Sequence, residues 1–375
     1  MPLSWALFMF SLRIEEVALP GAERDEEQLL EWLATSLNLV RRRNDESRNN
    51  ITGPPLYRLL QEHFLSNPWK GHESMDLAES LAISPATLHH HLGRLLDTRL
   101  VTGHTHKGAG SRIYFLRTGS LIGAVDLMIE EAKHLLNLRL NQAKSWMNGI
   151  NSSNRINERD DVSNRIWIQE QVPPAKIHKC NEQTLWMADL GLLGDRPGKS
   201  MNDKSPQIKL WNYMTKQTGP QSLDELEINF KKIKKAKIQR IMENFRRAGF
   251  LEKVPRYDRL SYLIWNMLKT QYLRRGKEWL LQKGGLIRQL GEKEANKLAN
   301  KLDSKSFQIS DVEEALRKIS NDKSMLLLNL LGGRLSFGYQ WSGSNYTEIM
   351  INVKDRAERS LRRIRRVAEL LQNEL

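Results

Sequence analysis

Polar side chains gather on one side of a short predicted helix that begins after Ser84. Leu88, Leu92 and Leu95 recur at i, i+4 and i+7, which places them on the side that faces the core. The opposite side is small or polar and carries Pro85, Ala86, His89, His90 and Gly93, with Thr87 and Arg94 at its margins. Hydroxyl, imidazole and guanidinium groups at this spacing can form hydrogen bonds with base edges and phosphates. The face therefore predicts recognition of nucleic acid.

A small set of elements must hold this face. Leu77, Ala78 and Leu81 predict a preceding helix, and Ser84 followed by Pro85 is typical of a helix start. Further upstream, four apolar residues at helical spacing predict a first helix: Leu56, Leu59, Leu60 and Phe64. Downstream, Leu100 and Val101 begin a strand, 112–117 supplies a return strand, and the tip between them is basic and rich in glycine.

Residues 50–120 therefore resemble the winged helix of the ArsR-like transcription regulators of bacteria and archaea. The matching residues are Ile83-Ser84, Thr87-Leu88, His91-Leu92, Leu95, Leu100-Val101 and Tyr114-Phe115-Leu116. The resemblance implies that the segment from Ser84 to Arg94 lies in the DNA major groove. We predict base or near-base contacts from Thr87, His89, His90 and Arg94. Lys107 and Arg112 of the wing would contact phosphates or the adjacent minor groove.

The resemblance does not extend to metal sensing. Members of the family that sense metals use cysteine or carboxylate clusters on the helix before the recognition helix, and this chain has only Asp76 and Glu79 there. A winged helix used for protein contacts is the alternative interpretation of this module.

A second helix-turn-helix pattern follows at 205–285. Apolar spacing predicts a helix from Pro206, Ser222-Leu223-Asp224-Glu225 is a capping box, and a longer helix runs from Ile233 to Arg247. Gly249 to Val254 then resembles the exit into a first wing strand, with 272–280 as the return strand and the start of the next helix.

The long helix of this second pattern is strongly basic. Between residues 231 and 247, eight lysines and arginines accompany one acid, Glu243. A run of charged residues is usually only the solvent-exposed face of a helix. Mutual repulsion among this many cations would, however, be relieved by binding of a phosphate backbone. We predict phosphate contacts from Lys231, Lys232, Lys234, Lys235, Lys237 and Arg240, which would position the duplex rather than identify its bases.

The chain divides by pattern into six segments. They are an N-terminal helix and linker (1–49), the first winged helix (50–120), a long helix (121–148), a linker with an irregular segment (149–204), the second winged helix (205–285) and a C-terminal unit (286–375). The last is expected to hold helices near 291–302, 310–320 and 322–331, a hairpin with strands 334–341 and 346–353, and a final helix. The predicted fold class is mainly α with small β-hairpins.

The long helix at 121–148 is apolar over much of its surface. We expect it to pair with its mate in a homodimer, as is common in regulators of this kind. Packing against the helix at 25–42 of the same chain is the alternative.

Composition favours a polyanion partner and a reducing compartment. The chain has 375 residues, a formal net charge of +14 and one cysteine, Cys180. No stretch is long and apolar enough to span a bilayer, so we expect a cytoplasmic protein without a membrane partner.

Catalytic, cofactor and metal sites are not expected. The segment 194–200 lacks the spacing of a phosphate loop, because position 193 is Leu where the motif needs glycine. His89, His90 and His91 project in different directions from a helix, and His104 and His106 share a strand face without a carboxylate or thiol nearby.

The sequence thus favours a non-enzymatic transcription regulator that binds specific sites in double-stranded DNA. A replication initiator or partition protein with tandem winged helices is an alternative, and a scaffold of a transcription or chromosome complex is another. An RNA-binding protein is a lesser alternative.

Overall fold

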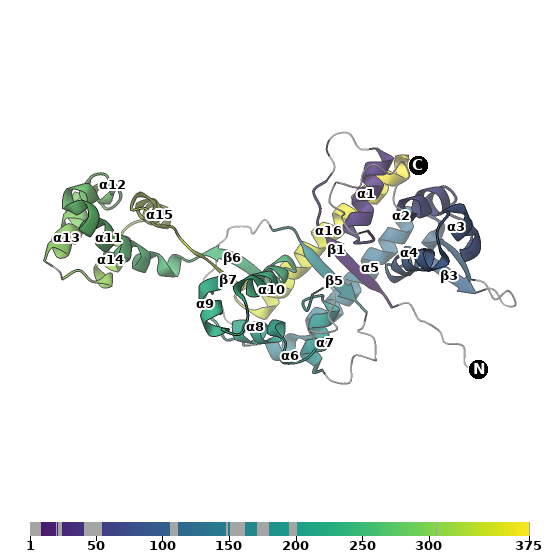
Figure 1. Ribbon diagram of the computed structural model, residues 1–375, viewed down its shortest axis with the longest axis horizontal. Coiled ribbons are helices and arrows are strands. Elements are labelled where there is room, and N and C mark those ends of the chain that lie inside the picture. Colours follow the sequence, from purple (N-terminus) through teal and green to yellow (C-terminus); the bar gives the residue numbers. More distant parts are fainter. Residues whose placement is uncertain are drawn as a thin grey trace. The chain divides into compact units, whose positions relative to one another are not determined.

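The structure is a computed structural model. It describes residues 9–19, 21, 25–40, 55–105, 112–147, 149–150, 162–170, 180–194, 201–304 and 306–374. As the sequence predicts, the chain is mainly helical with small sheets (Figure 1). It forms two compact units: the first unit comprises Met1–Thr218, Lys232–Glu252 and Trp341–Leu375, and the second unit comprises Gly219–Lys231 and Lys253–Gln340.

One part of the first unit contains the predicted polar helix. Its elements are, in order, α2 (Pro55–Arg58), which continues as the π-helix η2 (Leu59–Leu65), β2 (His72–Glu73), α3 (Ser74–Ser80), α4 (Pro85–Asp97), β3 (Val101–Thr105) and β4 (Arg112–Leu116). The strands form an antiparallel sheet in the order β2-β4-β3. The core contains Leu56, Leu77 and Leu88, all fully buried. Three helices and a hairpin thus follow one another as the pattern predicted, and the short strand β2 was not predicted.

The rest of the first unit is built around a long C-terminal helix. It contains strands β1 (Ser11–Glu15) and β5 (Arg165–Gln169), a 3₁₀ turn η3 (Arg117–Gly119), and helices α1 (Glu26–Ser36), α5 (Leu121–Gln142), α6 (Lys144–Met147), α7 (Glu182–Asp189), α8 (Pro206–Met214), α10 (Lys235–Arg247) and α16 (Tyr346–Glu374). β1 and β5 pair antiparallel, with Arg13 opposite Trp167. Helices α1 and α5 both pack against α16 (Figure 1).

Helix α16 corrects one prediction. Residues 346–353 are not a strand but the first turns of this helix, because Asn345 and Glu348 cap it. The Asn345 side chain accepts a hydrogen bond from Glu348 N at 3.1 Å, and Glu348 accepts bonds from the backbone and hydroxyl of Ser344 at 2.9 and 2.7 Å.

The long helix α5 packs its apolar side against other parts of its own chain. Its buried side includes Ala124, Val125 and Met128, and it packs against α16. Asp126 pairs with Arg365 of α16 at 2.7 Å, and Gln372 accepts a hydrogen bond from Ile122 N at 2.9 Å. The apolar surface from which the homodimer was expected is therefore largely covered, and by α16 rather than by α1.

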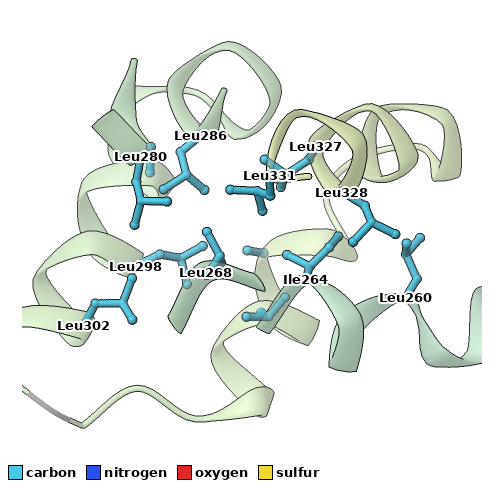
Figure 2. Packing of buried hydrophobic residues seen from close by; sticks show 13 residues of the cluster. Leu260, Ile264, Leu268, Leu280, Leu286, Leu298, Leu302, Leu327, Leu328 and Leu331 are labelled. Atoms are coloured by element: carbon cyan, nitrogen blue, oxygen red, sulfur yellow. The ribbon is translucent and has the colours of Figure 1, made fainter. Parts of the chain in front are cut away.

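The second unit contains a bundle of helices with its own apolar core. Its elements are α9 (Leu223–Asn229), most of strands β6 (Leu251–Pro255) and β7 (Phe337–Trp341), the turn η6 (Tyr257–Arg259), and helices α11 (Leu260–Leu281), α12 (Leu286–Leu290), α13 (Glu292–Asp303), α14 (Ile309–Leu316) and α15 (Asn321–Leu330). Leu268 of α11 is fully buried among residues such as Leu298 and Leu327 (Figure 2). The predicted helices at 291–302, 310–320 and 322–331 correspond to α13, α14 and α15.

The return strand of the second pattern lies far from its predicted place. Residues 272–280 belong to helix α11, with a kink at Gly276, and β6 pairs instead with β7. Hydrogen bonds from Arg256 N to Ser336 O (2.9 Å) and from Ser342 N to Phe250 O (2.9 Å) bracket this antiparallel pair. The prediction of the return strand was wrong because a whole helical bundle separates β6 from β7 in the sequence.

The strand order of the first sheet recurs in the second. Gln221, which precedes α9, bridges antiparallel to Tyr339 in β7, so the order is Gln221-β7-β6. Along the chain, helix α8, the extended Gln221, helices α9 and α10 and strands β6 and β7 repeat the sequence of elements from η2 to β4. The two series thus share the same order of elements and the same order of strand pairing. In the second series, the helices α11 to α15 are inserted between the last two strands.

A buried arginine holds the end of β6. Arg256 is 3% exposed, and its guanidinium donates hydrogen bonds to Glu225 and to Asp258. Burial would raise the pKa of Glu225, but hydrogen bonds from Arg256 and Ser222 lower it to about 2. A charge this well paired can be buried without a large cost.

Candidate nucleic-acid interface

Helix α4 presents its N-terminal half to solvent. The Ser84 hydroxyl accepts a hydrogen bond from Thr87 N at 3.2 Å and lies 2.9 Å from the Thr87 hydroxyl, so these two side chains cap the helix together. Leu88 and Leu92 are buried beneath. Ser84 and Thr87 thus remain exposed, but part of their hydrogen-bonding capacity is used by the helix start itself.

His89 and His90 are the exposed polar groups that α4 leaves open. Neither side chain forms a hydrogen bond with a residue that the structure describes. His91, by contrast, is half-buried, and burial is the main cause that lowers its pKa. The exposed imidazoles of His89 and His90 can donate hydrogen bonds to a base edge or phosphate, or accept them from a base edge.

Arg94 has a partner in its own chain. Its guanidinium donates to the carbonyl of Leu39, which follows α1. Arg94 therefore also ties α4 to the segment after α1, a contact that the sequence analysis did not foresee because the two residues are far apart along the chain. The base contact predicted for Arg94 is not tested by this hydrogen bond and stays a prediction.

The predicted wing is described only at its base. Thr105 pairs with Arg112 where β3 ends and β4 begins, and the aliphatic part of the Arg112 side chain lies over Gly103. Lys107 lies outside the described residues. Arg112 is half-buried.

A hollow of about 510 Å³ adjoins the C-terminal half of α4. Its lining comes from α4, from β1 and from the segment after α1, and includes His89, His90, Asp97, Arg13 and Asn38. Sequence reasoning missed the last three of these residues, because their proximity depends on the packing of distant segments and no local pattern signals it.

Helix α10 buries one side and exposes a basic one. Ile238, Met242 and Phe245 are fully buried, and the Phe245 ring meets that of Trp211 of α8 edge to face, with centroids 5.1 Å apart. All six basic residues predicted to contact phosphates are exposed: Lys231, Lys232, Lys234, Lys235, Lys237 and Arg240. Lys231 belongs to the second unit and the others to the first.

The start of α10 accumulates positive charge. Lys234 occupies the N-cap position without a side-chain cap, and the first turn has no acidic residue. The side chains of Lys232, Lys237 and Arg240 form no ion pair with any described residue. Because the helix dipole is itself positive at this end, the arrangement is unfavourable until an anion approaches.

The arginines of α16 differ from those of α10. Arg363 pairs with Glu16, Arg365 with Asp126 and Arg366 with Glu369. These charges are neutralised within the first unit, so α16 is a weaker candidate for phosphate contact than α10.

Other chemistry finds little support in the described part of the chain. No group of three or more histidine, cysteine or acidic residues there is placed to hold a metal ion. Cys180 is half-buried, its thiol donates to the carbonyl of Met201 at 3.1 Å, and burial is the main cause that raises its pKa. A raised pKa disfavours a reactive thiolate. Within the described residues, no helix combines the length and apolar character needed to cross a bilayer.

Comparisons with family models, with curated proteins and with solved structures found no match to this chain.

Proposed function

We propose that this protein binds double-stranded DNA through two winged-helix modules on one chain. The observation that carries the proposal is the repeated order helix, strand, helix, helix, strand, strand, with the first strand pairing to the last. In a winged helix the last helix of that series enters the major groove and the hairpin contacts the neighbouring backbone or minor groove.

The two modules differ in what their third helix offers. Helix α4 carries exposed groups able to discriminate bases, His89 and His90, beside the Ser84–Thr87 cap. Helix α10 carries lysines, which position a duplex but read little sequence. We therefore propose that the first module supplies specificity and the second supplies affinity that depends strongly on salt.

In cellular terms we propose a transcription regulator, on the resemblance of residues 50–120 to ArsR-like regulators. A tandem winged-helix initiator or partition protein is the second candidate, and the repeated module favours it. The first acts as a homodimer on inverted repeats, whereas the second binds direct repeats as a monomer. Because α16 covers most of the apolar surface of α5, that surface gives the dimer little support.

Selection of bound duplexes from a random pool, followed by footprinting, tests the proposal. We expect an enriched site, and log K falling with log salt by about 0.9 for each phosphate neutralised. A footprint with inverted symmetry supports the regulator and direct repeats support the initiator. Binding without enrichment over competitor DNA, or binding of RNA in preference to duplex DNA, would contradict the proposal.

A pair of matched variants tests the first module. His89→Ala with His90→Ala should flatten the base preference, because it removes the exposed imidazoles of α4. Arg362→Gln with Arg366→Gln changes charge on α16 and should leave both affinity and preference near those of the parent protein.

A further inference from the structure

The hollow beside α4 brings together groups of opposite charge. Arg13 reaches it from β1, Arg94 and Asp97 from α4, and Asn38 from the segment after α1. The guanidinium of Arg13 also lies over the Trp167 ring, 3.6 Å from its centroid, which fixes its direction. The hollow, about 510 Å³, is of a size that holds a small organic molecule.

Asp97 is the one acidic group among the described residues that line this hollow. It is half-buried, and it accepts no hydrogen bond from a described residue. Burial raises its pKa to about 6, although the charge of Arg13 opposes that rise. A half-buried carboxyl that lacks a donor is expected to gain from one, most of all from a cationic donor.

Asn38 adds a second open group, on the wall formed by the segment after α1. Its backbone adopts a left-handed conformation, with φ of 51°, at the turn that ends α1. Its side-chain amide forms no hydrogen bond with a described residue. The Leu39 carbonyl beside it accepts from Arg94, so the turn holds this wall against α4.

We propose that this hollow binds a small zwitterion of the α-amino-acid type. Its carboxylate would lie against the guanidinium groups of Arg13 and Arg94, and its ammonium would donate to Asp97. Asn38 would take part as an additional hydrogen-bonding group. The ligand class follows from the charges: a simple anion leaves Asp97 without a donor, and a simple cation is repelled by two arginines.

A regulatory consequence rests on the proposed DNA-binding function. His89 and His90, in the middle of α4, line the same hollow. A ligand seated there contacts the helix that we propose enters the major groove, so ligand and DNA must affect each other's affinity reciprocally.

The binding test uses the full-length protein without DNA. Thermal unfolding is followed with each of the proteinogenic amino acids at millimolar concentration, because a ligand that binds only the folded state raises the unfolding temperature. We expect at least one amino acid to raise it, and its N-acetyl and carboxamide derivatives, which lack one charge each, to lose the effect. No rise with any amino acid overturns the proposal.

Matched variants locate the site. Asp97→Asn and Arg13→Gln should weaken binding of the active amino acid at least about tenfold. Glu130→Gln and Arg362→Gln make the same chemical changes at exposed positions on α5 and α16 and should keep parental affinity. If a hollow variant unfolds, Asn38→Ala, with an expected weakening of a few-fold, takes its place. Unchanged affinity in both Asp97→Asn and Arg13→Gln overturns the assignment.

DNA is added only after that result. The amino acid should change the Kd for the selected duplex, and the change should vanish in Asp97→Asn. Absence of DNA binding with intact amino-acid binding contradicts the proposed function alone. Intact DNA binding without any amino-acid effect overturns the regulatory part of the inference.

Discussion

His90 and Arg94 lie about one turn apart on α4, but their surroundings differ. Substituting them should therefore affect DNA discrimination and the free energy of unfolding differently. His90 is exposed and has no hydrogen bond to a described residue, whereas Arg94 donates to Leu39. We expect His90→Ala to reduce discrimination between bases by about 1–3 kcal/mol without changing the free energy of unfolding.

Arg94→Ala should act on the fold as well. Removing its hydrogen bond to the Leu39 carbonyl should lower the free energy of unfolding by about 1 kcal/mol, measured by urea denaturation. Arg94→Lys, which keeps the charge but not the fork of donors, should recover little of that loss. A fully stable Arg94→Ala protein would mean that the contact to Leu39 contributes nothing measurable.

The carboxyl of Asp97 should make stability depend on pH. Its folded pKa of about 6 lies above the ordinary value of 3.8, so the fold favours the protonated form. Stability contributed by this group is present below pH 4 and is lost as the pH rises toward 6. Relative to the parent, Asp97→Asn should be more stable at pH 7.5 and not at pH 4, and urea midpoints at the two pH values measure this.

At this scale the sequence predicted side-chain types better than side-chain partners. The Ser84 cap and the buried Leu88 follow from spacing within one helix, and both are present. The Arg94 contact to Leu39 and the approach of Arg13 to Asp97 join segments that are far apart along the chain. No local sequence pattern predicts such contacts.

Helix α10 offers the clearest prediction at the scale of an element. Replacing Lys234, Lys235 and Lys237 together by Ala should weaken all duplexes to a similar extent, because phosphate contacts carry no sequence information. The salt slope should fall by about 0.9 for each contact removed. Fluorescence anisotropy against salt concentration provides the measurement, with Arg362→Gln and Arg366→Gln on α16 as the control.

An unchanged slope in the lysine variant would remove α10 from the interface. The variant itself should fold at least as well as the parent, since it removes positive charge from the positive end of a helix dipole. A loss of affinity can therefore be read as a loss of contact.

The N-terminus of α16 supplies a test of folding. Asn345→Ala should lower the free energy of unfolding by about 0.5–2 kcal/mol, because the Asn345 side chain accepts from Glu348 N at the first turn. Asn345→Asp keeps an acceptor and should stay near the parental value. Both are measured by chemical denaturation of the whole chain, in which α16 packs against α1 and α5.

Elements were predictable where the apolar period was long and undisturbed. Helices α4, α10 and α13 lie close to where spacing placed them. The start of α16 was mistaken for a strand because Tyr346 to Val353 is rich in residues that favour strands, and the capping pair Asn345 and Glu348 was the signal that would have corrected it.

For the whole molecule, the sequence predicted a second series of similar elements but not the insertion between its last two strands. The strands β6 and β7 are separated by the five helices α11 to α15, and pairing over that distance leaves no periodic trace in the chain. The inserted helices have their own buried core around Leu268 and Leu298. They therefore have what an independently folding module requires.

That organisation predicts that the bundle can be removed without losing the proposed DNA-binding surface. Arg256 N donates to Ser336 O at 2.9 Å, so these residues face each other where the strands end. Replacing residues 257–335 by Asn-Gly should close β6 and β7 as a two-residue hairpin. Arg256 loses Asp258 but keeps Glu225, which avoids an unpaired buried charge.

The shortened protein should remain folded, with the lysines of α10 and the histidines of α4 still in place, and should keep the site preference and most of the salt slope of the parent. Circular dichroism and duplex titration measure the two properties. A folded deletion protein that no longer binds duplex DNA would instead assign the contact to the inserted helices. Because α4 and α10 both lie in the first unit, we expect the binding to stay with them.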